Sequence, residues 1–449
     1  MFDFPDDQIA QVSLEHNFWT WSAQGGVDPI PVTRAEGVYF WDAHGKRYLD
    51  FNSMMMCVNL GHGDPRVIEA IVAQARALPF AHGSMATRPL AELGRLLAHL
   101  TPGDMDHFLY TLGGAEANEN AIKLARAVTG RHKILTRYRS YHGATAGAMA
   151  LTGDPRRHSW EPNLMGGVVH FLDPYRYRST FHRTNPDIPE AEFTRDYLNH
   201  LEEIITYEGP GTIAAVMVES VTGTNGILIP PDGYMQGVRA LCDKYGILMI
   251  ADEVMAGFGR TGKWFAVDHW GVVPDLMTMA KGLTSSYLPL GAVGMRPFIA
   301  EHFRERVFQS GLTYSGHTLT LAAAVANIKA MMEDDVVGQA AARGVFLRQQ
   351  LMDLGEKHPS IGDVRSIGLF AGVELVKNRE TREPLSPFNQ TTEPMKRLRK
   401  FCLERGLNIF MHWNVVLIVP PLIITEELLA EGLAVLDEAL AIADAEVTE

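Results

Sequence analysis

Two short apolar runs, each ending in acidic residues, limit what this chain can fold into. The runs AAVMVES and ILMIADEV end at Ser220 and Val254. Continuous apolar runs of this length are typical of strands that are buried on both faces of a parallel sheet. Ligands of such α/β sheets bind at the carboxyl ends of the strands. We therefore expect Glu219, Asp252 and Glu253 at a ligand-binding edge.

The remaining pattern predicts one compact unit with a discontinuous smaller domain. The opening segment alternates apolar and polar residues with Gly turns, and then PRVIEAIVAQARAL begins an alternation of helices and strands. A helix in LAAAVANIKAMM, strands around GLFAGVELV and NVVLIVPPL and a helix from Thr425 follow. Because a chain this long exceeds one usual core, we predict a small-domain segment at 1–60, a large domain at 61–318 and a small domain at 319–449.

Charge and cysteine content argue against several classes of partner. Forty Lys and Arg against 53 Asp and Glu give a net charge of -13, with no long basic run to attract nucleic acid. Cys57, Cys242 and Cys402 lie in no paired metal spacing, so neither a metal site nor a disulfide framework is expected. MFDFPDDQIA does not resemble a signal peptide, and no apolar run approaches ~20 residues. We expect a cytoplasmic protein that contacts no membrane.

Residues 247–291 hold the strongest chemical signal. Asp252 closes a buried strand, a Gly-rich turn follows, and Lys281 appears 29 positions later between small residues. A lysine amine can form a Schiff base with an aldehyde cofactor, and an Asp that keeps a pyridine nitrogen protonated makes the ring an electron sink. The alternative is a strand-end Asp and a solvated surface lysine. The uncharged surroundings MTMAKGLTSSYLPLGAV argue against that alternative.

A phosphate site is predicted in TLGGAEANENAIKLAR. Gly113, Gly114 and Ala115 lead directly into a helical pattern, so backbone N–H groups can reach a phosphate at the positive end of a helix. Tyr141 and His142 follow, and an aromatic ring there can stack on a flat cofactor. A Gly-Gly pair alone usually marks an ordinary turn or loop, and a Tyr-His pair alone is usually part of the core. Together with the lysine and the aspartate, they predict a pyridoxal-phosphate (PLP) site.

These segments resemble the class III (ω-type) aminotransferases, a branch of the fold-type I PLP enzymes. The likeness extends over almost the whole chain. Its motifs occur in the family's order, namely PIPVTRAEGVYFWDAHGKRYLDF, NLGHGDPRV, GGAEANENAIKLAR, SYHGAT, DEVMAGFGRTG to AKGLTSSYLPLGAV, TYSGHT and VPPLIITEE. The resemblance implies an α/β fold in which a large domain with a mostly parallel seven-stranded sheet adjoins a smaller α+β domain.

The resemblance assigns the polar cofactor contacts. It implies that Lys281 forms the Schiff base and later moves the proton between the substrate carbon and the cofactor. Asp252 pairs with the pyridinium nitrogen, and Glu219 supports the surroundings of the ring. Gly114 and Ala115 bind the phosphate through their backbone.

The resemblance also assigns the stacking and the subunit contacts. Tyr141, with His142 beside it, stacks on one face of the ring, and Val254 packs on the other. Thr313 in TYSGHT matches a threonine that reaches the phosphate of the neighbouring subunit. The expected assembly is therefore a homodimer or a dimer of dimers with active sites at the interface.

Departures from the family pattern concern the substrate more than the chemistry. GGA replaces the commoner Ser-Gly-Ser, so backbone amides must do more for the phosphate. Met255 replaces a glutamine of the ornithine and 4-aminobutyrate enzymes, which favours the broader amine-accepting subgroup. Phe410 stands where many ω-transaminases have a mobile arginine for the acceptor carboxylate, so that function must move elsewhere.

The predicted substrate contacts are mostly apolar, and core or interface packing is the alternative for each of them. An anionic head group could meet the ring nitrogens of His412 and Trp413, whereas Arg88 is better explained as an exposed helix-end residue. The other predicted contacts are Phe18, Trp19, Trp21, Met56 and Met85.

The expected reaction is ping-pong transfer of the amino group of a primary (terminal) amine or ω-amino acid to an oxo acid such as pyruvate. β-Alanine, taurine, hypotaurine, 4-aminobutyrate and diamines are the candidate donors, and VTGTNGILIPPDGY with HWN is similar to taurine-type enzymes. Two alternatives stay open: a lyase or aminomutase that uses the same cofactor, and a non-catalytic PLP-binding protein. Pyruvate-dependent formation of alanine distinguishes an aminotransferase from both of these alternatives.

Overall fold

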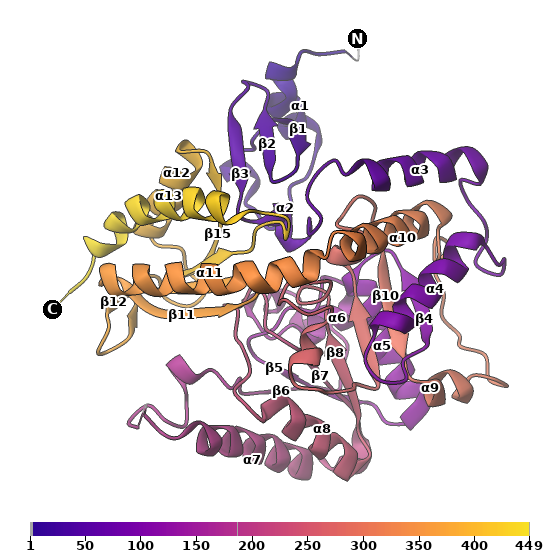
Figure 1. Cartoon of the computed structure of the whole chain (residues 1–449). Coiled ribbons are helices and arrows are strands. Elements are labelled where there is room, and N and C mark those ends of the chain that lie inside the picture. Colours follow the sequence, from indigo (N-terminus) through magenta and orange to yellow (C-terminus); the bar gives the residue numbers. More distant parts are fainter. Residues whose placement is uncertain (1–2, 186, 449) are drawn as a thin grey trace.

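The computed structural model describes residues 3–185 and 187–448, and a seven-stranded sheet lies at its centre (Figure 1). In spatial order the strands are β4 (His107–Thr111), β10 (Gly291–Met295), β9 (Leu276–Met279), β8 (Leu248–Asp252), β7 (Ile213–Glu219), β5 (Lys133–Arg137) and β6 (Val168–Phe171). Only β10 runs antiparallel to its neighbours, β4 and β9. The predicted mostly parallel, seven-stranded sheet is confirmed.

The two apolar runs are adjacent strands of this sheet. Every residue of β7 and β8 is buried, and the parallel register pairs Glu219 with Asp252. The predicted runs extend past the strands, which end at these two acids. Chain pairing stops there because the Asp252 carboxylate accepts the N–H of Val254, which turns the backbone out of the ladder. Both carboxyl groups therefore lie at one edge of the sheet.

Helices cover both faces of the central sheet. Helix α5 (Gly114–Thr129) packs against β7, β9 and β10, whereas α7 (Glu190–Glu208) and α8 (Tyr234–Tyr245) pack on each other and on β6 and β8. The predicted helix after residue 64 and the one around residue 325 pack together. The other helices of this part are α3 (Pro65–Ala77), α4 (Arg88–Leu100), α6 (Ala146–Leu151), α9 (Pro297–His302) and α10 (Thr318–Glu333).

The two ends of the chain share one small sheet, because β3 pairs in parallel with β14. That sheet has the order β1 (Val32–Glu36), β2 (Tyr39–Asp42), β3 (Arg47–Asp50) and β14 (Leu407–Asn408). The short helices α1 (Ile9–His16) and α2 (Ser53–Met56) flank its N-terminal strands in the chain. The pairing joins the N-terminal segment to the C-terminal part, and the domain boundaries at residues 60 and 318 stay a prediction.

A second small sheet lies under the C-terminal helices (Figure 1). Its strands are β11 (Ile361–Ile367), β12 (Phe370–Asn378), β13 (Glu383–Pro384), β15 (Phe410–His412) and β16 (Val415–Ile418). Helices α11 (Val336–Lys357) and α13 (Glu426–Asp444) pack on it, and α12 (Glu393–Glu404) packs on α13. Thr425 caps α13 by accepting the N–H of Leu428.

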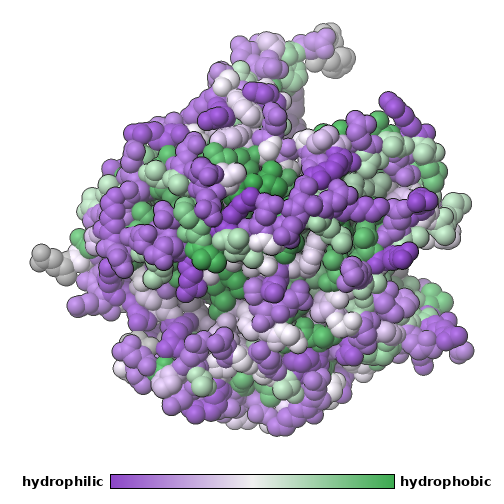
Figure 2. All heavy atoms as spheres, viewed as in Figure 1, coloured by the Kyte–Doolittle hydropathy of each residue, from purple (hydrophilic) through white to green (hydrophobic). Residues whose placement is uncertain are grey.

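The surface in Figure 2 is mainly hydrophilic, with hydrophobic residues in scattered groups. Among the described residues, no helix has both the length and the apolar character that a membrane span requires. The largest buried side chains instead belong to the core beneath and between the sheets, and two of them, Arg137 and Arg260, are charged.

Candidate active site

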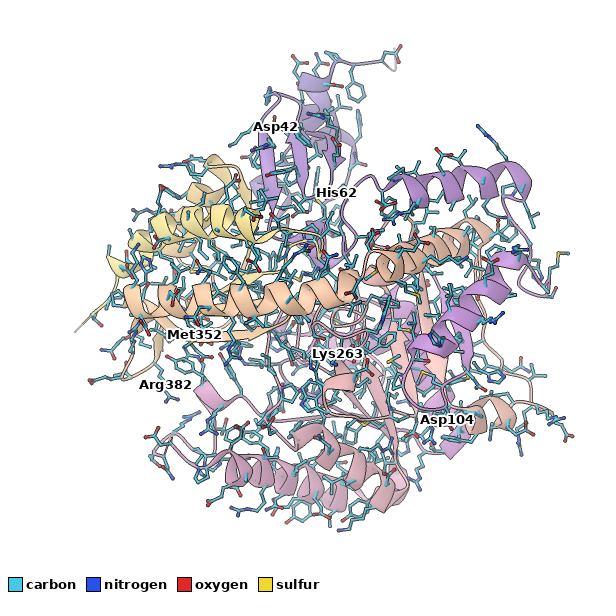
Figure 3. The ribbon with its side chains drawn as sticks, in the orientation of Figure 1. Asp42, His62, Asp104, Lys263, Met352 and Arg382 are labelled. Atoms are coloured by element: carbon cyan, nitrogen blue, oxygen red, sulfur yellow. The ribbon has the colours of Figure 1, made fainter. Side chains whose placement is uncertain are left out.

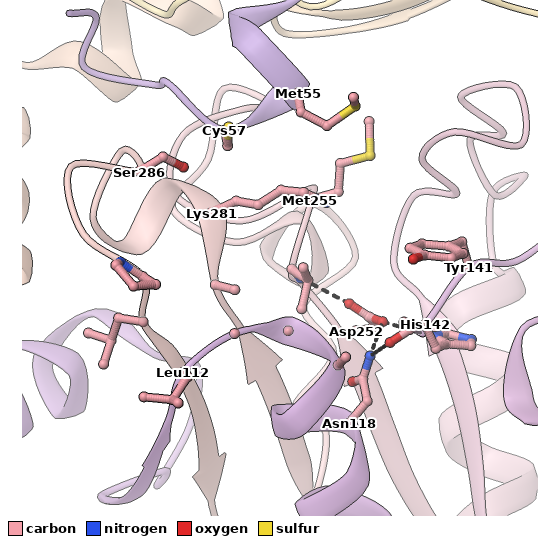
Figure 4. A pocket seen from close by; sticks show the side chains of 18 of the residues that line it. Met55, Cys57, Leu112, Asn118, Tyr141, His142, Asp252, Met255, Lys281 and Ser286 are labelled. Carbon is pink, nitrogen blue, oxygen red and sulfur yellow. Dashed lines mark hydrogen bonds and ion pairs between the residues drawn. The ribbon is translucent and has the colours of Figure 1, made fainter. Parts of the chain in front are cut away.

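A cavity of about 520 Å³ opens at the carboxyl ends of β7 and β8 (Figure 4). Its walls come from the start of α5, the loop after β5, the ends of the two acidic strands and the segment after β9. Glu219, Asp252 and Lys281 all line it. The predicted edge of the sheet therefore does hold a hollow that is large enough for a small cofactor.

Three donors hold the Asp252 carboxylate in place. This side chain is 3% exposed and accepts hydrogen bonds from Asn118 Nδ2 at 2.9 Å and from Val254 N at 3.0 Å. His142 Nδ1 lies 2.7 Å from the same carboxylate, and its Nε2 lies 3.1 Å from the hydroxyl of Thr136. These contacts fix the position and orientation of the carboxylate in the cavity wall.

Glu219 has a different task, although it ends the neighbouring strand. Its two carboxylate oxygens accept the backbone N–H of Tyr141 at 3.0 Å and that of Gly223 at 2.7 Å. Burial raises the pKa of Glu219, and the negative charge of Asp252 adds to this rise. Glu219 therefore ties down the loop that carries Tyr141, on the border of the cavity.

Lys281 is the first residue of a short 3-10 turn that directly follows β9. Its backbone has a φ of 43°, a left-handed conformation that non-glycine residues rarely adopt, and this backbone turns the side chain into the cavity. Burial lowers the pKa of Lys281, while Cys57 and the carboxylates Asp252 and Glu219 oppose the fall. An amine with a lowered pKa is more often neutral and therefore a better nucleophile for an aldehyde.

Helix α5 begins at Gly114, and its first residues line the cavity. Because the first N–H groups of a helix have no partner within it, they can bind an anion. A side chain at Gly114 would bring its Cβ to 2.7 Å from Val254, so only glycine lets the helix start this close to the residue after β8. The site needs the small residue for packing and leaves the backbone amides of Gly114 and Ala115 available.

Arg156 was not predicted, yet it lies at the border of the cavity. Its guanidinium carbon is 3.8 Å from the ring centroid of Tyr141, and its Nη2 donates to the Thr224 hydroxyl at 3.0 Å. It also pairs with Asp154, whose pKa the interaction with Arg156 lowers against the effect of burial. The charge of Arg156 is near enough to contribute to the lowered pKa of Lys281. In the sequence, GDPRRHS offers two adjacent arginines and no signal that distinguishes them.

Met55, rather than the predicted Met56, faces the cavity. Met55 lines the wall and is 39% exposed, whereas Met56 is 1% exposed and packs in the core. Ser53, Met54 and Met56 all have positive φ angles, so side chains in this segment do not alternate as in a regular element. Figure 4 shows Met55 beside Met255, on the side of Lys281 away from Asp252.

Several predicted substrate residues lie away from this cavity in the single chain. Phe18, Trp21 and Met85 are 84%, 67% and 59% exposed, and Thr313 is exposed as well. Trp19 is half-buried but does not line the cavity. The single chain therefore brings neither the predicted entrance residues Phe18, Trp19 and Trp21 nor the predicted partner contacts Met85 and Thr313 to its own Lys281.

The predicted pair His412 and Trp413 also lies outside the cavity wall. Trp413 is buried, with its ring 4.3 Å from that of Phe388, and its neighbour His412 stacks near Phe410. Burial lowers the pKa of His412 to about 4, with a further contribution from Arg156. Arg88 makes an exposed ion pair with Glu92 at 2.8 Å, as expected for a helix-end arginine.

The family described as aminotransferase class-III matches residues 21–440. The chain belongs to the class III aminotransferases. It is 44% identical to a taurine:2-oxoglutarate aminotransferase from Bifidobacterium kashiwanohense, solved with PLP and glutamate, with a TM-score of 0.96 and full coverage of both chains (100%). It is also 36% identical to the putrescine–pyruvate aminotransferase of Pseudomonas aeruginosa over 404 residues, a stretch that covers 88% of this chain and 86% of the Pseudomonas protein. The taurine–pyruvate aminotransferase of Rhodobacter capsulatus is 36% identical over 80% of this chain and 79% of its own.

This class III aminotransferase uses PLP and moves amino groups from amines or ω-amino acids to oxo acids. The cavity fits that cofactor. The unpaired amides at the start of α5 suit its phosphate, and the buried carboxylate of Asp252 suits a protonated pyridine nitrogen. Lys281 supplies the only lysine amine among the residues that line the described cavity.

Proposed function

We propose that Lys281 holds PLP covalently, while Asp252 keeps the pyridine nitrogen protonated. The observation behind this assignment is one cavity that contains a desolvated lysine and a carboxylate fixed by three donors. When bound, PLP supplies an aldehyde that exchanges amino groups and a ring that accepts the electrons of the substrate carbon. Lys281 Nζ would move a proton from the substrate carbon to the cofactor in the first half of a ping-pong reaction and in the opposite direction in the second half.

The surrounding residues position the ring and the phosphate. Gly114 and Ala115 bind the phosphate through their amides, and Val254 packs on one face of the ring. Tyr141 stacks on the other face, supported by its backbone bond to Glu219 and by Arg156 on its far side. His142 contributes through its contact with the Asp252 carboxylate.

The active unit in this proposal is a cytoplasmic homodimer or a dimer of dimers. Thr313 then reaches the phosphate of the neighbouring subunit, and Trp21 and Met85 contribute to its substrate channel. The exposure of Trp21 and Met85 in the single chain supports this assembly, because a large aromatic or thioether side chain gains free energy when a partner covers it.

The proposed donor is a terminal amine with an anionic far end, and taurine is the first candidate. Two relatives with taurine in their names support this choice. Arg156 provides the cation for that far end and replaces the arginine that is absent at Phe410. Arg156 lies beside Tyr141 at the cavity border, close enough to contribute to the lowered pKa of Lys281. Its guanidinium would then bind the anionic end of the donor and Asp154 at the same time.

A donor panel in two variants tests this proposal. Taurine is compared with propylamine, which lacks the anionic end, by kcat/KM, with pyruvate and with 2-oxoglutarate as acceptors. We expect the wild-type enzyme to prefer taurine, and Arg156→Met to lose about tenfold to a hundredfold of that preference, the amount expected for a charged hydrogen bond. Arg131→Met is the matched control, because Arg131 bonds to the carbonyls of Ile213 and Gly246 at the opposite edge of the sheet.

The proposed donor class is contradicted if the wild-type enzyme does not prefer taurine to propylamine. It is also contradicted if Arg156→Met keeps the wild-type preference. Product analysis in the same assays separates the other reactions. An amine consumed without any oxo acid indicates a lyase or an aminomutase, and no consumption with any donor indicates a non-catalytic PLP-binding protein.

A further inference from the structure

A second cavity of about 410 Å³ lies next to the turn that carries Arg156. Its walls come from Tyr138 and Arg139 after β5, from the 3-10 turn Pro155–Arg157, from the loop after β6 and from Phe388. It shares no lining residue with the active cavity. The proposed PLP site therefore does not account for it.

Three arginines line this cavity, and two of them have carboxylate partners. Arg157 Nε donates to Glu161 at 2.8 Å, and Arg178 pairs closely with Glu374. Arg139 is the third, and the described residues place no carboxylate within 4.0 Å of its guanidinium. Asp173 is the one acid among the described lining residues, so three arginines face one aspartate there, in a chain whose net charge is -13.

Three aromatic rings lie around the Arg139 guanidinium. Its central carbon is 5.0 Å from the ring centroid of Tyr175, 5.3 Å from Phe388 and 5.8 Å from Trp413. Among the described residues its one hydrogen bond is a long one, 3.4 Å, to the carbonyl of Asn225. Burial lowers the pKa of Arg139, yet an arginine stays protonated in proteins. The charges of Glu374 and Asp173 oppose this fall, but neither acid forms an ion pair with the guanidinium within 4.0 Å among the described residues, and a buried charge without a close partner costs free energy.

The charges of two acids, Glu374 and Asp173, reach Arg139; Glu374 is paired with arginines, whereas Oδ1 of Asp173 is buried without a hydrogen-bond partner among the described residues. Asp173 turns one carboxylate oxygen to the backbone N–H of Arg139 at 2.7 Å, and Glu374 pairs with Arg178 and Arg365. The Nη2 group of Arg178 is buried without a partner. Burial lowers the pKa of Arg178 to about 10, and the nearby charge of Arg139 contributes to the fall. Two neighbouring guanidinium groups therefore have unused donors.

We propose that this second cavity binds a small oxyanion, such as a carboxylate, sulfonate, sulfate or phosphate, between Arg139 and Arg178. Planar guanidinium groups match the geometry of such anions, and the anion balances the charge that the protein leaves unpaired. Figure 3 helps to locate the site: Arg382, whose carbonyl accepts a bond from Arg178 at 2.8 Å, lies below α11 on the side of α7. This oxyanion site is separate from the one proposed at Arg156.

The first test uses crystals of the unchanged, PLP-loaded enzyme soaked in selenate. Anomalous scattering from selenium locates the anion without any substitution, so a folding defect cannot confuse the result. We expect a peak within hydrogen-bond distance of the Arg139 and Arg178 guanidinium groups. A cavity without a peak at saturating selenate overturns the proposal.

The second test measures sulfate binding to the PLP-loaded enzyme by calorimetry, with chloride keeping the ionic strength constant. We expect Arg139→Gln and Arg178→Gln each to weaken the binding about tenfold or more, because each removes a charged hydrogen bond. Arg131→Met is the control, because Arg131 lies at the opposite edge of the sheet, and it should retain wild-type sulfate affinity. Equal affinity in Arg139→Gln and the wild type, or selenate in the crystal without binding in solution, overturns the proposal.

Separate titrations with sulfate, phosphate, taurine and 2-oxoglutarate then identify the class of anion. The oxyanion that binds most tightly, and whose binding Arg139→Gln weakens, is assigned to the site. Failure of all four to bind contradicts the oxyanion site but leaves the proposed PLP chemistry and the donor preference untouched, because those rest on the other cavity.

Discussion

The two walls of the active cavity are built in different ways. The cofactor wall, here Asp252 with Asn118 and His142, stands at strand ends and at a helix start, and hydrogen bonds of 2.7 to 3.0 Å fix its carboxylate. The substrate wall, here Met55 and Met255, consists of flexible thioether side chains without directional bonds. A charge buried at a sheet edge requires fixed partners, whereas an apolar wall can change shape with the substrate.

The sharpest way to break this comparison is Lys281→Ala. We expect kcat to fall by at least about 10⁴-fold for every donor, since the variant loses both the covalent anchor and the proton carrier. PLP should still bind, but without a covalent bond, because the groups proposed for its phosphate and ring nitrogen remain. Borohydride reduction followed by peptide mapping is the measurement: wild-type enzyme should be labelled at Lys281 and the variant nowhere. Full activity in the variant contradicts the assignment.

A matched pair of methionines sharpens the comparison on the other wall. Met55→Ala should change kcat/KM by roughly tenfold at most, by different factors for donors of different size, and leave the stability unchanged. Met56→Ala should instead lower the free energy of unfolding by about 2 to 5 kcal/mol and leave the ratio between donors unchanged. Steady-state kinetics with a donor series and urea denaturation measure the two effects. The reverse outcome would mean that Met56 faces the substrate after all.

The same difference explains how much of the site could be predicted from the sequence. Asp252 and Lys281 were recognisable because Asp252 closes a buried strand and Lys281 stands in an otherwise uncharged stretch. Met55 and Met56 were confused because left-handed backbone conformations in their segment break any regular alternation, and the letters MMM do not show this. Arg156 was missed because only the fold brings its turn over the ring of Tyr141.

The fold itself was largely predictable where periodicity decides it. The apolar runs of β7 and β8, the parallel sheet and the helices after residues 64 and 317 follow from patterns that depend on burial alone. The contacts proposed for Trp21 and Thr313 involve a second chain, which no pattern within one chain describes. The cavity of Arg139 depends on rings and loops that are distant in the sequence, such as Phe388 and Trp413.

His412 gives the smallest predicted effect, and this effect concerns stability rather than catalysis. Its pKa falls from an ordinary value of about 6.5 to about 4 in the folded chain, because burial and then the charges of Arg156 and Arg139 disfavour the imidazolium, against the opposing charge of Asp154. Between these two values the unfolded chain binds more protons than the folded chain. The free energy of unfolding should therefore fall as the pH falls from 6.5 to 4, by about 3 kcal/mol as an upper limit, and stay constant above 6.5.

Urea denaturation of the wild type and of His412→Gln at several pH values between 4.5 and 7.5 isolates this contribution. The wild type should lose more stability than the variant on acidification, because glutamine cannot take up the proton that the buried imidazole resists. His16→Gln is the control, since it removes a histidine side chain that is 74% exposed. If His412→Gln loses as much stability on acidification as the wild type, His412 takes up its proton equally in the folded and unfolded chains, and the expected effect of its burial is contradicted.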